Sequence, residues 1–325
     1  MVAPSARPSV GIEGQPGSAR PSVGIDLGGT RIKAGLVVDG QLAAERVVGV
    51  AARDPDAIVA QLASVIAELT SDPAIPVGLA AAGVIDARTS TVRESPNFPS
   101  WKDFSLGARL ARASGHRVYL ENDANAVILG EAIYGVARGA SSVVGYTLGT
   151  GVGGGILLGG RLWRGERGMA GELGHVTVVP DGRPCNCGNR GCLERYAGQV
   201  GIAETLLALG PPLSRLTDPE PSDAARRLSE LAAHGDPDAI AIFAEVGRFL
   251  GQAAAAVVLT LDVTTLVLAG GVAGAFDLIA PAMQAELERR TFRSMSDGVR
   301  ILHGTLGAHA GIFGAAASTL AALPD

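Results

Sequence analysis

The sequence contains one glycine-rich hairpin pattern twice, as SVGIDLGGTRIKAGLVVDGQL from Ser22 and as SVVGYTLGTGVGGGILLGGRL from Ser142. In each copy an apolar strand ends in a glycine turn, a second strand follows, and a tight Asp-Gly or Gly-Gly turn closes the hairpin. This repetition predicts a duplicated α/β domain with a ligand-binding cleft between the copies. The first strands align at four positions, which are Val23, Gly24, Leu27 and Gly28 in one copy and Val144, Gly145, Leu148 and Gly149 in the other.

Length and composition agree with two soluble domains. The chain has 325 residues, 47% of them hydrophobic and 18% charged, which suits a packed core rather than a disordered chain. The net charge of −5 without a basic block argues against binding to nucleic acid or to an anionic membrane. The longest apolar stretch, near Leu250 to Leu261, is too short to cross a bilayer. We therefore expect a cytoplasmic protein that does not contact the membrane.

The domain boundaries follow from the repeat. We expect residues 1–21 to be a disordered extension, because ARPSVGI occurs at 6–12 and 19–25 and only the second copy continues into an apolar strand. Residues 22–122 would form the first α/β domain and residues 123–325 the larger second one, with a C-terminal helix able to pack back on the first. The pattern also predicts helices after Asp54-Pro55 and over Ala124–Tyr134, and buried strands at Val77–Ala81, Arg117–Leu120 and Thr265–Ala269.

Three glycine turns at strand ends are candidate nucleotide-binding loops: DLGGT at 26–30, LGTGVGGG at 148–155 and LAGGVAG at 268–274. Adjacent glycines let backbone N–H groups approach a phosphate without a Cβ clash. Thr30 can donate to a phosphate oxygen, and Asp26 can hold Mg²⁺ through water. For one turn alone, an ordinary hairpin is an equally good interpretation. No GK[ST] follows, and the turns join strand to strand, so neither a Walker A motif nor a dinucleotide fingerprint is present.

The three cysteines, Cys185, Cys187 and Cys192, lie within eight residues, and His175 precedes them. Clustered cysteines in an otherwise cysteine-free chain favour a metal over disulfides. Three thiolates and one imidazole form a tetrahedral structural zinc set with no open position, which argues against a catalytic zinc. The alternative is three incidental buried thiols. We expect the zinc to fix His175 and the loop over residues 175–194 that carries Glu194.

The segment ELGHVTVVPDGRPCNCGNRGCLE matches the ExGH and CxCGxxGCxE signatures of the ROK family of sugar kinases and repressors in order and spacing. The three glycine turns resemble the phosphate and adenosine loops of the actin-like, hexokinase-type ATPases, and the resemblance runs from Ser22 to the C-terminus. It implies two actin-like (hexokinase/ribonuclease H-like) α/β domains around a cleft, with a zinc-binding loop in the second. The residues it implies for nucleotide binding are Asp26, Gly28, Gly29, Thr30, Lys33, Gly149, Thr150, Gly151, Gly270 and Gly271.

The resemblance also implies a hexose site. Glu172 and His175 are three residues apart, so a helical turn would put them on one face. His175 would bind zinc through one ring nitrogen and the sugar through the other. Asp123 would be the general base, and the alternative for it is a helix N-cap. The sugar-binding residues implied are Gly83, Asn97, Asn122, Asp123, Glu172, His175 and Glu194.

These expectations describe an ATP-dependent hexose kinase, with glucose as the leading substrate, Mg²⁺ as cofactor, and a homodimeric or homotetrameric assembly by resemblance. N-acetylglucosamine, N-acetylmannosamine, fructose, mannose and allose remain alternative substrates, because no residue decides the shape of the pocket at C2. Polyphosphate is a less favoured donor, since relatives that use it generally lack the zinc loop. A sugar-responsive repressor is the alternative from another class. We do not expect a repressor, because its winged-helix domain would need more residues than are given ahead of the DLGGT turn.

Overall fold

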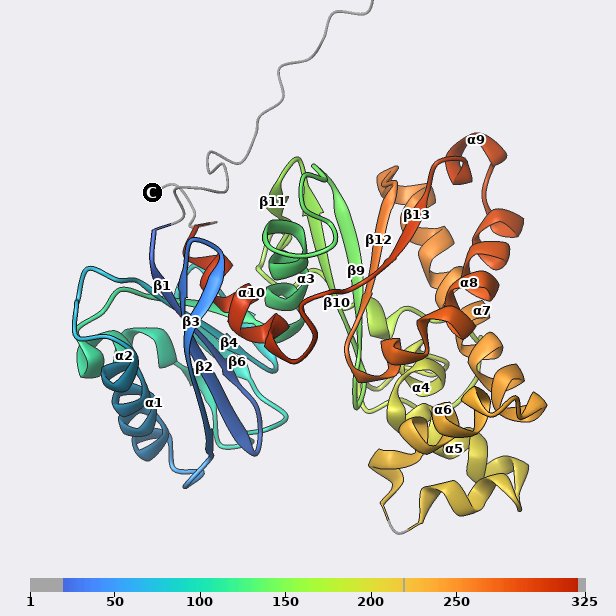
Figure 1. Cartoon of the computed structure of the whole chain (residues 1–325), viewed down its shortest axis with the longest axis horizontal. Helices are drawn as coiled ribbons and strands as arrows, with labels where there is room; N and C mark the ends of the chain where they lie inside the picture. Colours follow the sequence, from blue (N-terminus) through green and yellow to red (C-terminus); the bar gives the residue numbers. More distant parts are fainter. Residues whose placement is uncertain (1–19, 219, 321–325) are drawn as a thin grey trace, which may run out of the picture.

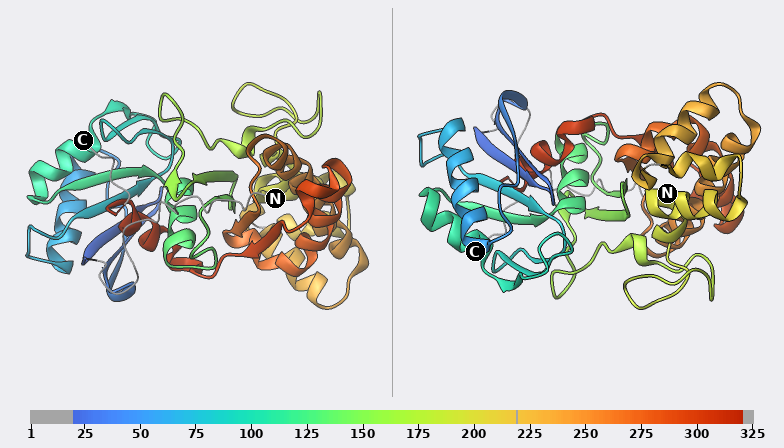
Figure 2. Two further views of the ribbon diagram at one scale, coloured as in Figure 1. Left: turned by 90° about the horizontal axis from the view of Figure 1, so that it is seen from above. Right: turned by 90° about the horizontal axis from the view of Figure 1, so that it is seen from below.

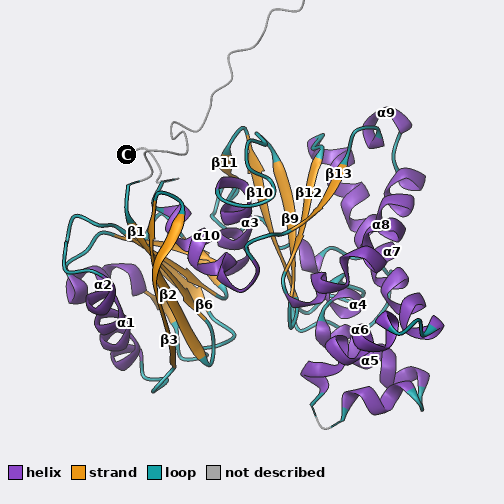
Figure 3. Ribbon diagram, in the orientation of Figure 1, coloured by secondary structure: helices purple, strands orange, loops and turns teal. Residues whose placement is uncertain are grey.

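Two five-stranded sheets of the same topology form the framework of the protein (Figures 1 and 3). The computed structural model describes residues 20–218 and 220–320, so nearly all of the extension expected over residues 1–21 lies outside the described residues. In each sheet three consecutive antiparallel strands are followed by two parallel ones. The first sheet has the order β3 (Gln41–Gly49), β2 (Arg31–Val38), β1 (Ser22–Leu27), β4 (Val77–Ala81) and β8 (Val118–Asn122). The second has the order β11 (Arg161–Leu162), β10 (Val152–Leu158), β9 (Val143–Leu148), β12 (Thr265–Ala269) and β13 (Arg300–His303). The duplication predicted from the two glycine hairpins is confirmed.

Two helices, α3 (Asp123–Ile133) and α10 (Ala310–Ser318), lie between the sheets, and the views from above and below agree on this (Figure 2). Helix α10 packs on β1 and β4 of the first sheet, α3 packs on β9 and β10 of the second, and the helices pack on each other. Glycine makes these approaches possible. A Cβ at Gly24 would lie 2.0 Å from a carbonyl oxygen of α10, and one at Gly145 would lie 2.2 Å from the Ile128 side chain of α3. The aligned glycines of the repeat therefore serve the same purpose, which is to seat a central helix closely on each sheet.

The remaining helices lie outside the central pair, either beside the two sheets or at the lower end of the second half in Figure 1. In the first half, α1 (Pro55–Leu69) begins as predicted, with the Asp54 side chain accepting hydrogen bonds from the backbone N–H groups of Asp56 and Ala57. A small third sheet extends this half. The other elements there are α2 (Leu106–Ser114), β5 (Val84–Asp86), β6 (Thr91–Glu94) and β7 (Lys102–Phe104). In the second half are α4 (Glu194–Ala197), α5 (Gln199–Leu209), α6 (Ala224–Ala233), α7 (Pro237–Leu261), α8 (Phe276–Arg290) and α9 (Arg293–Ser296), with 3₁₀ turns η1 (Leu173–His175), η2 (Leu213–Thr217), η3 (Pro221–Asp223), η4 (Gly271–Ala275) and η5 (Gly307–His309).

Helix α7 corrects the expectation that no apolar segment is long enough to span a bilayer. Its 25 residues have the length and hydropathy of a membrane-spanning helix. Its apolar residues are, however, largely buried, chiefly against α8, in the core cluster that they share with strands of the second sheet, and Leu250 and Val258 are fully covered. We therefore interpret α7 as the central core helix of the second half.

Two boundaries differ slightly from the prediction. The strand expected over Arg117–Leu120 runs over Val118–Asn122, and the following helix begins at Asp123, one residue early. The division into domains at residues 122 and 123 stays a prediction. It coincides with the junction of β8, in the first sheet, and α3, which packs on the second.

Candidate active site

The predicted metal ligands converge. One ligand atom from each of His175, Cys185, Cys187 and Cys192 lies within 4.8 Å of the others, and the three cysteines are free of disulfides. His175 Nδ1 lies 3.6 Å from Cys185 Sγ, and the Sγ atoms of Cys187 and Cys192 are also 3.6 Å apart. In a tetrahedral site with Zn–S bonds of about 2.3 Å, two sulfur ligands lie roughly 3.8 Å apart. The four side chains therefore fit a zinc ion.

The electrostatics of the cysteines fit a cation as well. Burial raises the pKa of the Cys192 thiol, and the neighbouring thiols Cys187 and Cys185 raise it further. A backbone hydrogen bond at Asn189 lowers the pKa of Cys187, so ionisation is opposed at Cys192, and a divalent cation removes that opposition. Gly188 and Gly191 have φ angles of 90° and 75°, which favour glycine and let the loop fold around the four side chains.

His175 connects this cluster to a carboxylate. The 3₁₀ turn η1 begins directly after Glu172 and ends at His175, so the two side chains share a face, as their spacing predicts. His175 Nε2 lies 3.8 Å from Glu172 Oε2, while its Nδ1 faces Cys185. One ring nitrogen is thus directed at the metal ligands and the other at a carboxylate outside them.

The segment that ends β8 places an amide and a carboxylate side by side. Asn122 is the N-cap of α3, since its Oδ1 accepts a hydrogen bond from the Asn125 backbone N–H (3.0 Å). The alternative considered for Asp123, a helix N-cap, is therefore wrong. Asp123 is the first helical residue, and its Oδ1 accepts from the Ala124 N–H (2.9 Å). The Asn122 side chain also donates to the Gly83 carbonyl (3.0 Å), which joins two predicted sugar-binding residues.

Carboxylates from four segments influence one another near Asp123. Burial raises the pKa of Asp123 above its ordinary value, although hydrogen bonds to the carboxylate oppose this shift. Burial also raises the pKa of Glu172, with His175 lowering it and the charges of Asp123 and Glu194 raising it further. The pKa of Asp26 is raised by burial and then by Asp123, while Lys33 lowers it. A cluster of this kind can accept hydrogen bonds from several hydroxyl groups and favours a nearby cation.

Glu194 lies directly against the second glycine turn. Its Oε2 accepts a hydrogen bond from the Val152 N–H (3.2 Å), and a Cβ built on Gly151 would lie 2.0 Å from the same oxygen. The turn is also held by α5, where the N–H of Gln199 donates to the Gly149 carbonyl (2.9 Å) and that of Val200 to the Thr150 carbonyl (3.3 Å). A predicted sugar ligand therefore contacts a predicted phosphate loop.

The third glycine turn lies beside the second. Gly270 has a φ of 92°, and a Cβ there would lie 2.6 Å from the Leu148 carbonyl oxygen. Gly271 faces the Gln199 side chain, at the start of α5. The turns at residues 149–151 and 270–271 are thus brought together around one helix N-terminus, a favourable place for anionic groups.

The DLGGT turn has contacts within the first half and, through Asp26, with Gly311 of α10. The N–H of Gly28 donates to the Arg31 carbonyl (3.0 Å), which closes the turn around Thr30. A Cβ on Gly29 would lie 2.9 Å from the side-chain oxygen of Asn97, so Asn97 lies against this turn. Lys33, on β2, donates to the Ala308 carbonyl (3.3 Å) just ahead of α10.

The sequence interpretation missed a buried ion pair that supports the site. Glu121 is 2% exposed, and its Oε2 lies 2.7 Å from Arg164. Its Oε1 accepts from the Asn122 N–H (2.9 Å) and from the Asn125 side chain (3.1 Å). A glutamate ending a buried strand is a visible signal, but Arg164 lies 43 residues away and no local pattern connects the two.

The carboxylate cluster is separate from a cavity of about 490 Å³ in the second half. That cavity lies between α5 and α7, with Leu209 and Phe249 in its wall. None of the predicted site residues lines it, so it is a different feature from the candidate site.

Two sheets of one topology, with glycine turns at their strand ends, define a hexokinase-like α/β fold. The ROK family profile matches residues 22–321, and the chain belongs to the ROK family. A protein named Glucokinase from Thermotoga maritima is 34% identical over 303 residues, covering 90% of this chain and 95% of its own.

Solved structures show the same fold. A ROK family glucokinase from Streptomyces griseus, in complex with glucose and AMPPNP, is 32% identical with a TM-score of 0.74, covering 91% of this chain and 98% of its own. A ROK family transcriptional regulator, a homologue of the Escherichia coli Mlc protein, is 26% identical with a TM-score of 0.82, covering 93% and 78%. The fold thus occurs in both kinases and regulators, and the function must be argued from the site.

Proposed function

We propose that this protein is an ATP-dependent hexose kinase that phosphorylates glucose at the 6-hydroxyl. The observation that carries the proposal is the contact of Glu194 with the glycine turn at residues 149–151. A site that transfers a phosphoryl group must bring the acceptor hydroxyl and the donor phosphates within reach of one another. Likeness to kinases named Glucokinase supports the same assignment.

In this proposal the hexose is held by hydrogen bonds from both halves of the chain. Asn122, Glu172, His175 and Glu194 would bind its hydroxyls, with Gly83 and Asn97 as further contacts. Asp123 would accept the proton of the 6-hydroxyl as that oxygen bonds to the γ-phosphorus of ATP and ADP leaves. Burial raises the pKa of its carboxylate, which makes the ionised group a better proton acceptor than an exposed aspartate.

The nucleotide would be bound by the glycine turns. Backbone N–H groups of Gly28, Gly29, Gly149 and Gly151, with the Thr30 and Thr150 hydroxyls and Lys33, would face the phosphates. Gly270 and Gly271 would lie against the adenosine. Burial and then the charge of Asp123 raise the pKa of Asp26, and a Mg²⁺ ion near it, held through water, would favour its ionised form. Such an ion would also neutralise charge on the phosphates.

The zinc would be structural in this account. All four ligands come from the protein, so no position is open for water or substrate. Bound through Nδ1 of His175, the ion would fix the ring whose Nε2 faces Glu172.

Closure of the proposed domains, residues 22–122 and 123–325, would exclude water from the phosphoryl transfer.

A hexose panel with ATP and with polyphosphate as donors tests the proposal, with ADP and sugar 6-phosphate both measured. We expect kcat/KM to be highest for glucose with ATP. If kcat/KM is higher for N-acetylglucosamine, N-acetylmannosamine, fructose or mannose, that sugar takes the place of glucose as the proposed substrate. Sugar binding without turnover would favour a regulator.

A further inference from the structure

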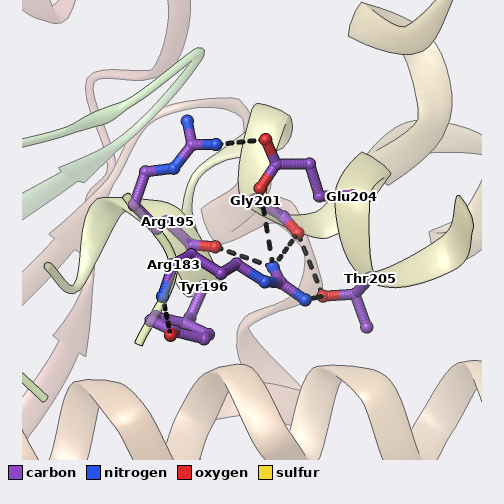
Figure 4. Close-up of polar contacts among 6 residues, drawn as sticks. All are labelled: Arg183, Arg195, Tyr196, Gly201, Glu204 and Thr205. Atoms are coloured by element: carbon purple, nitrogen blue, oxygen red, sulfur yellow. Dashed lines mark hydrogen bonds and ion pairs between the residues drawn. The ribbon is translucent and has the colours of Figure 1, made fainter. Parts of the chain in front are cut away.

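Arg183, two residues before the first cysteine of the metal loop, contacts two helices of the second half at once (Figure 4). Its Nη1 donates to the carbonyl oxygens of Arg195 (2.8 Å) and Gly201 (2.9 Å), and its Nη2 donates to Thr205 Oγ1 (3.0 Å). Its own backbone N–H donates to Tyr196 Oη (2.9 Å), and the guanidinium lies 4.9 Å from the centre of that ring. This residue therefore joins the metal loop to both α4 and α5.

The carbonyl of Arg195 is available because the usual helical hydrogen bond is not made. In a continuous helix the N–H of Gln199, four residues later, would donate to it. Instead α4 ends at Ala197, and the Gln199 N–H donates to the carbonyl of Gly149 in the second glycine turn. The next N–H, that of Val200, donates to Thr150. The guanidinium of Arg183 thus donates to the Arg195 carbonyl in place of the Gln199 N–H, which donates to the glycine turn.

The backbone is tightly packed at the corner where α4 meets α5. A Cβ built on Gly201 would lie 2.5 Å from the Arg195 carbonyl oxygen, so the two backbones are in direct contact there. Arg195 itself pairs with Glu204 of α5, which also lies 3.9 Å from Arg183 (Figure 4). The first residue of α4 is Glu194, so the position of this corner determines where that carboxylate meets the glycine turn.

We propose that Arg183 is a positioning residue that keeps α4 and α5 as two separate helices, so that the N–H groups of Gln199 and Val200 stay on the glycine turn at residues 149–151. Without the guanidinium, the Arg195 carbonyl accepts the hydrogen bond of the Gln199 N–H, and the glycine turn loses the hydrogen bond from Gln199 to Gly149. The inference rests on the proposed function, in which this turn binds nucleotide phosphate and Glu194 binds the sugar. A change in the metal loop is thereby transmitted to the nucleotide side of the site.

The test compares Arg183→Ala and Arg183→Lys with Arg190→Ala in the full chain. Arg190 lies in the same loop, is exposed, and has one long hydrogen bond, 3.4 Å, to the Asp181 carbonyl. Three quantities are measured: zinc content, hydrogen exchange at the amides of Gln199 and Val200, and KM for ATP and glucose. For Arg183→Ala we expect full zinc, faster exchange at both amides, and a rise of about tenfold or more in KM for ATP. Arg183→Lys keeps the charge but not the branched guanidinium, so its amide exchange and KM for ATP should be intermediate. Arg190→Ala should match the parent in all three quantities.

The exchange measurement separates this inference from the proposed function. If the parent phosphorylates no hexose, the proposed function fails, while faster exchange at Gln199 and Val200 still supports the positioning role. A zinc-loaded Arg183→Ala protein with parental exchange at both amides, or with a parental KM for ATP, overturns the inference. Loss of zinc would assign Arg183 to the metal loop alone and overturn it too. If Arg183→Ala does not fold, Arg183→Lys decides by the same readouts.

Discussion

His175 presents one ring nitrogen to Cys185 and the other to Glu172: its Nδ1 lies 3.6 Å from the sulfur and its Nε2 lies 3.8 Å from the carboxylate oxygen. A metal bound at Nδ1 fixes the orientation of the ring and therefore the position of Nε2. Occupancy of the metal site and binding of sugar should for this reason be linked.

Removal of one thiolate tests that link. We expect the parent to contain about one zinc per chain. Cys187→Ser should lose the ion, melt at a lower temperature and bind glucose more weakly, because the ring of His175 and the Glu194 loop are no longer held. Elemental analysis and calorimetry measure these effects. Asn186→Ser is the matched control, since Asn186 is exposed between two ligands and should keep the metal. A full zinc complement in Cys187→Ser would reject the assignment of the ligands.

A methyl group added at Gly151 should affect function more than stability. Its Cβ would lie 2.0 Å from Glu194 Oε2, and the end of a flexible side chain can move away. Gly151→Ala should therefore displace the carboxylate and raise KM for glucose by about tenfold or more, with little loss of stability. Gly49→Ala, which would meet nothing closer than 4.0 Å, is the control. Steady-state kinetics that match the parent would remove Glu194 from the sugar site.

Glu131 should stabilise the connection that leads into α10. It is fully buried in α3 and accepts hydrogen bonds from the backbone N–H groups of Val136 (3.1 Å), Thr305 (3.1 Å) and Leu306 (2.9 Å). In Glu131→Gln an amide group would face some of these donors, and the free energy of unfolding should fall by about 2–4 kcal/mol. Glu68→Gln, which weakens an exposed pair with Arg46, should change it by less than about 1 kcal/mol. Denaturant titration distinguishes the two, and equal effects would contradict this role.

The pH dependence of turnover should show the raised pKa of Asp123. A general base acts when it is deprotonated, so kcat at saturating substrates should fall as pH falls through that pKa, which lies above the ordinary 3.8. Recovery of activity on return to neutral pH, with zinc retained, excludes acid unfolding and metal loss. A kcat that stays constant down to about pH 4, near the ordinary value for aspartate, would contradict the assignment.

Most of the fold could be predicted from the sequence because the strongest sequence signals are local. The repeated glycine hairpins indicated both sheets, and Asp54-Pro55 marked the start of α1, since caps and turns depend on neighbouring residues. The cluster of His175 and three cysteines was equally clear, because three of its four side chains lie within one short loop.

Other features depend on contacts that no local pattern contains. Arg164 pairs with Glu121 across 43 residues, and Arg183 contacts carbonyls that become available only when α4 ends at Ala197. The role of Asn122 as N-cap was missed for a different reason, since asparagine and aspartate cap equally well and stand side by side there.

The most direct test of the account is kcat for Asp123→Asn with glucose and ATP. The substitution keeps the size of the side chain, and the cap of α3 belongs to Asn122. Because the raised pKa of Asp123 means that its ionisation opposes folding at neutral pH, the variant should melt no lower than the parent. Asp56→Asn, at an exposed carboxylate in the first turn of α1, is the control. We predict a fall in kcat of about 10²–10⁴ with glucose affinity largely kept. A folded variant with kcat within about threefold of the parent, far short of a general-base effect, would contradict the account.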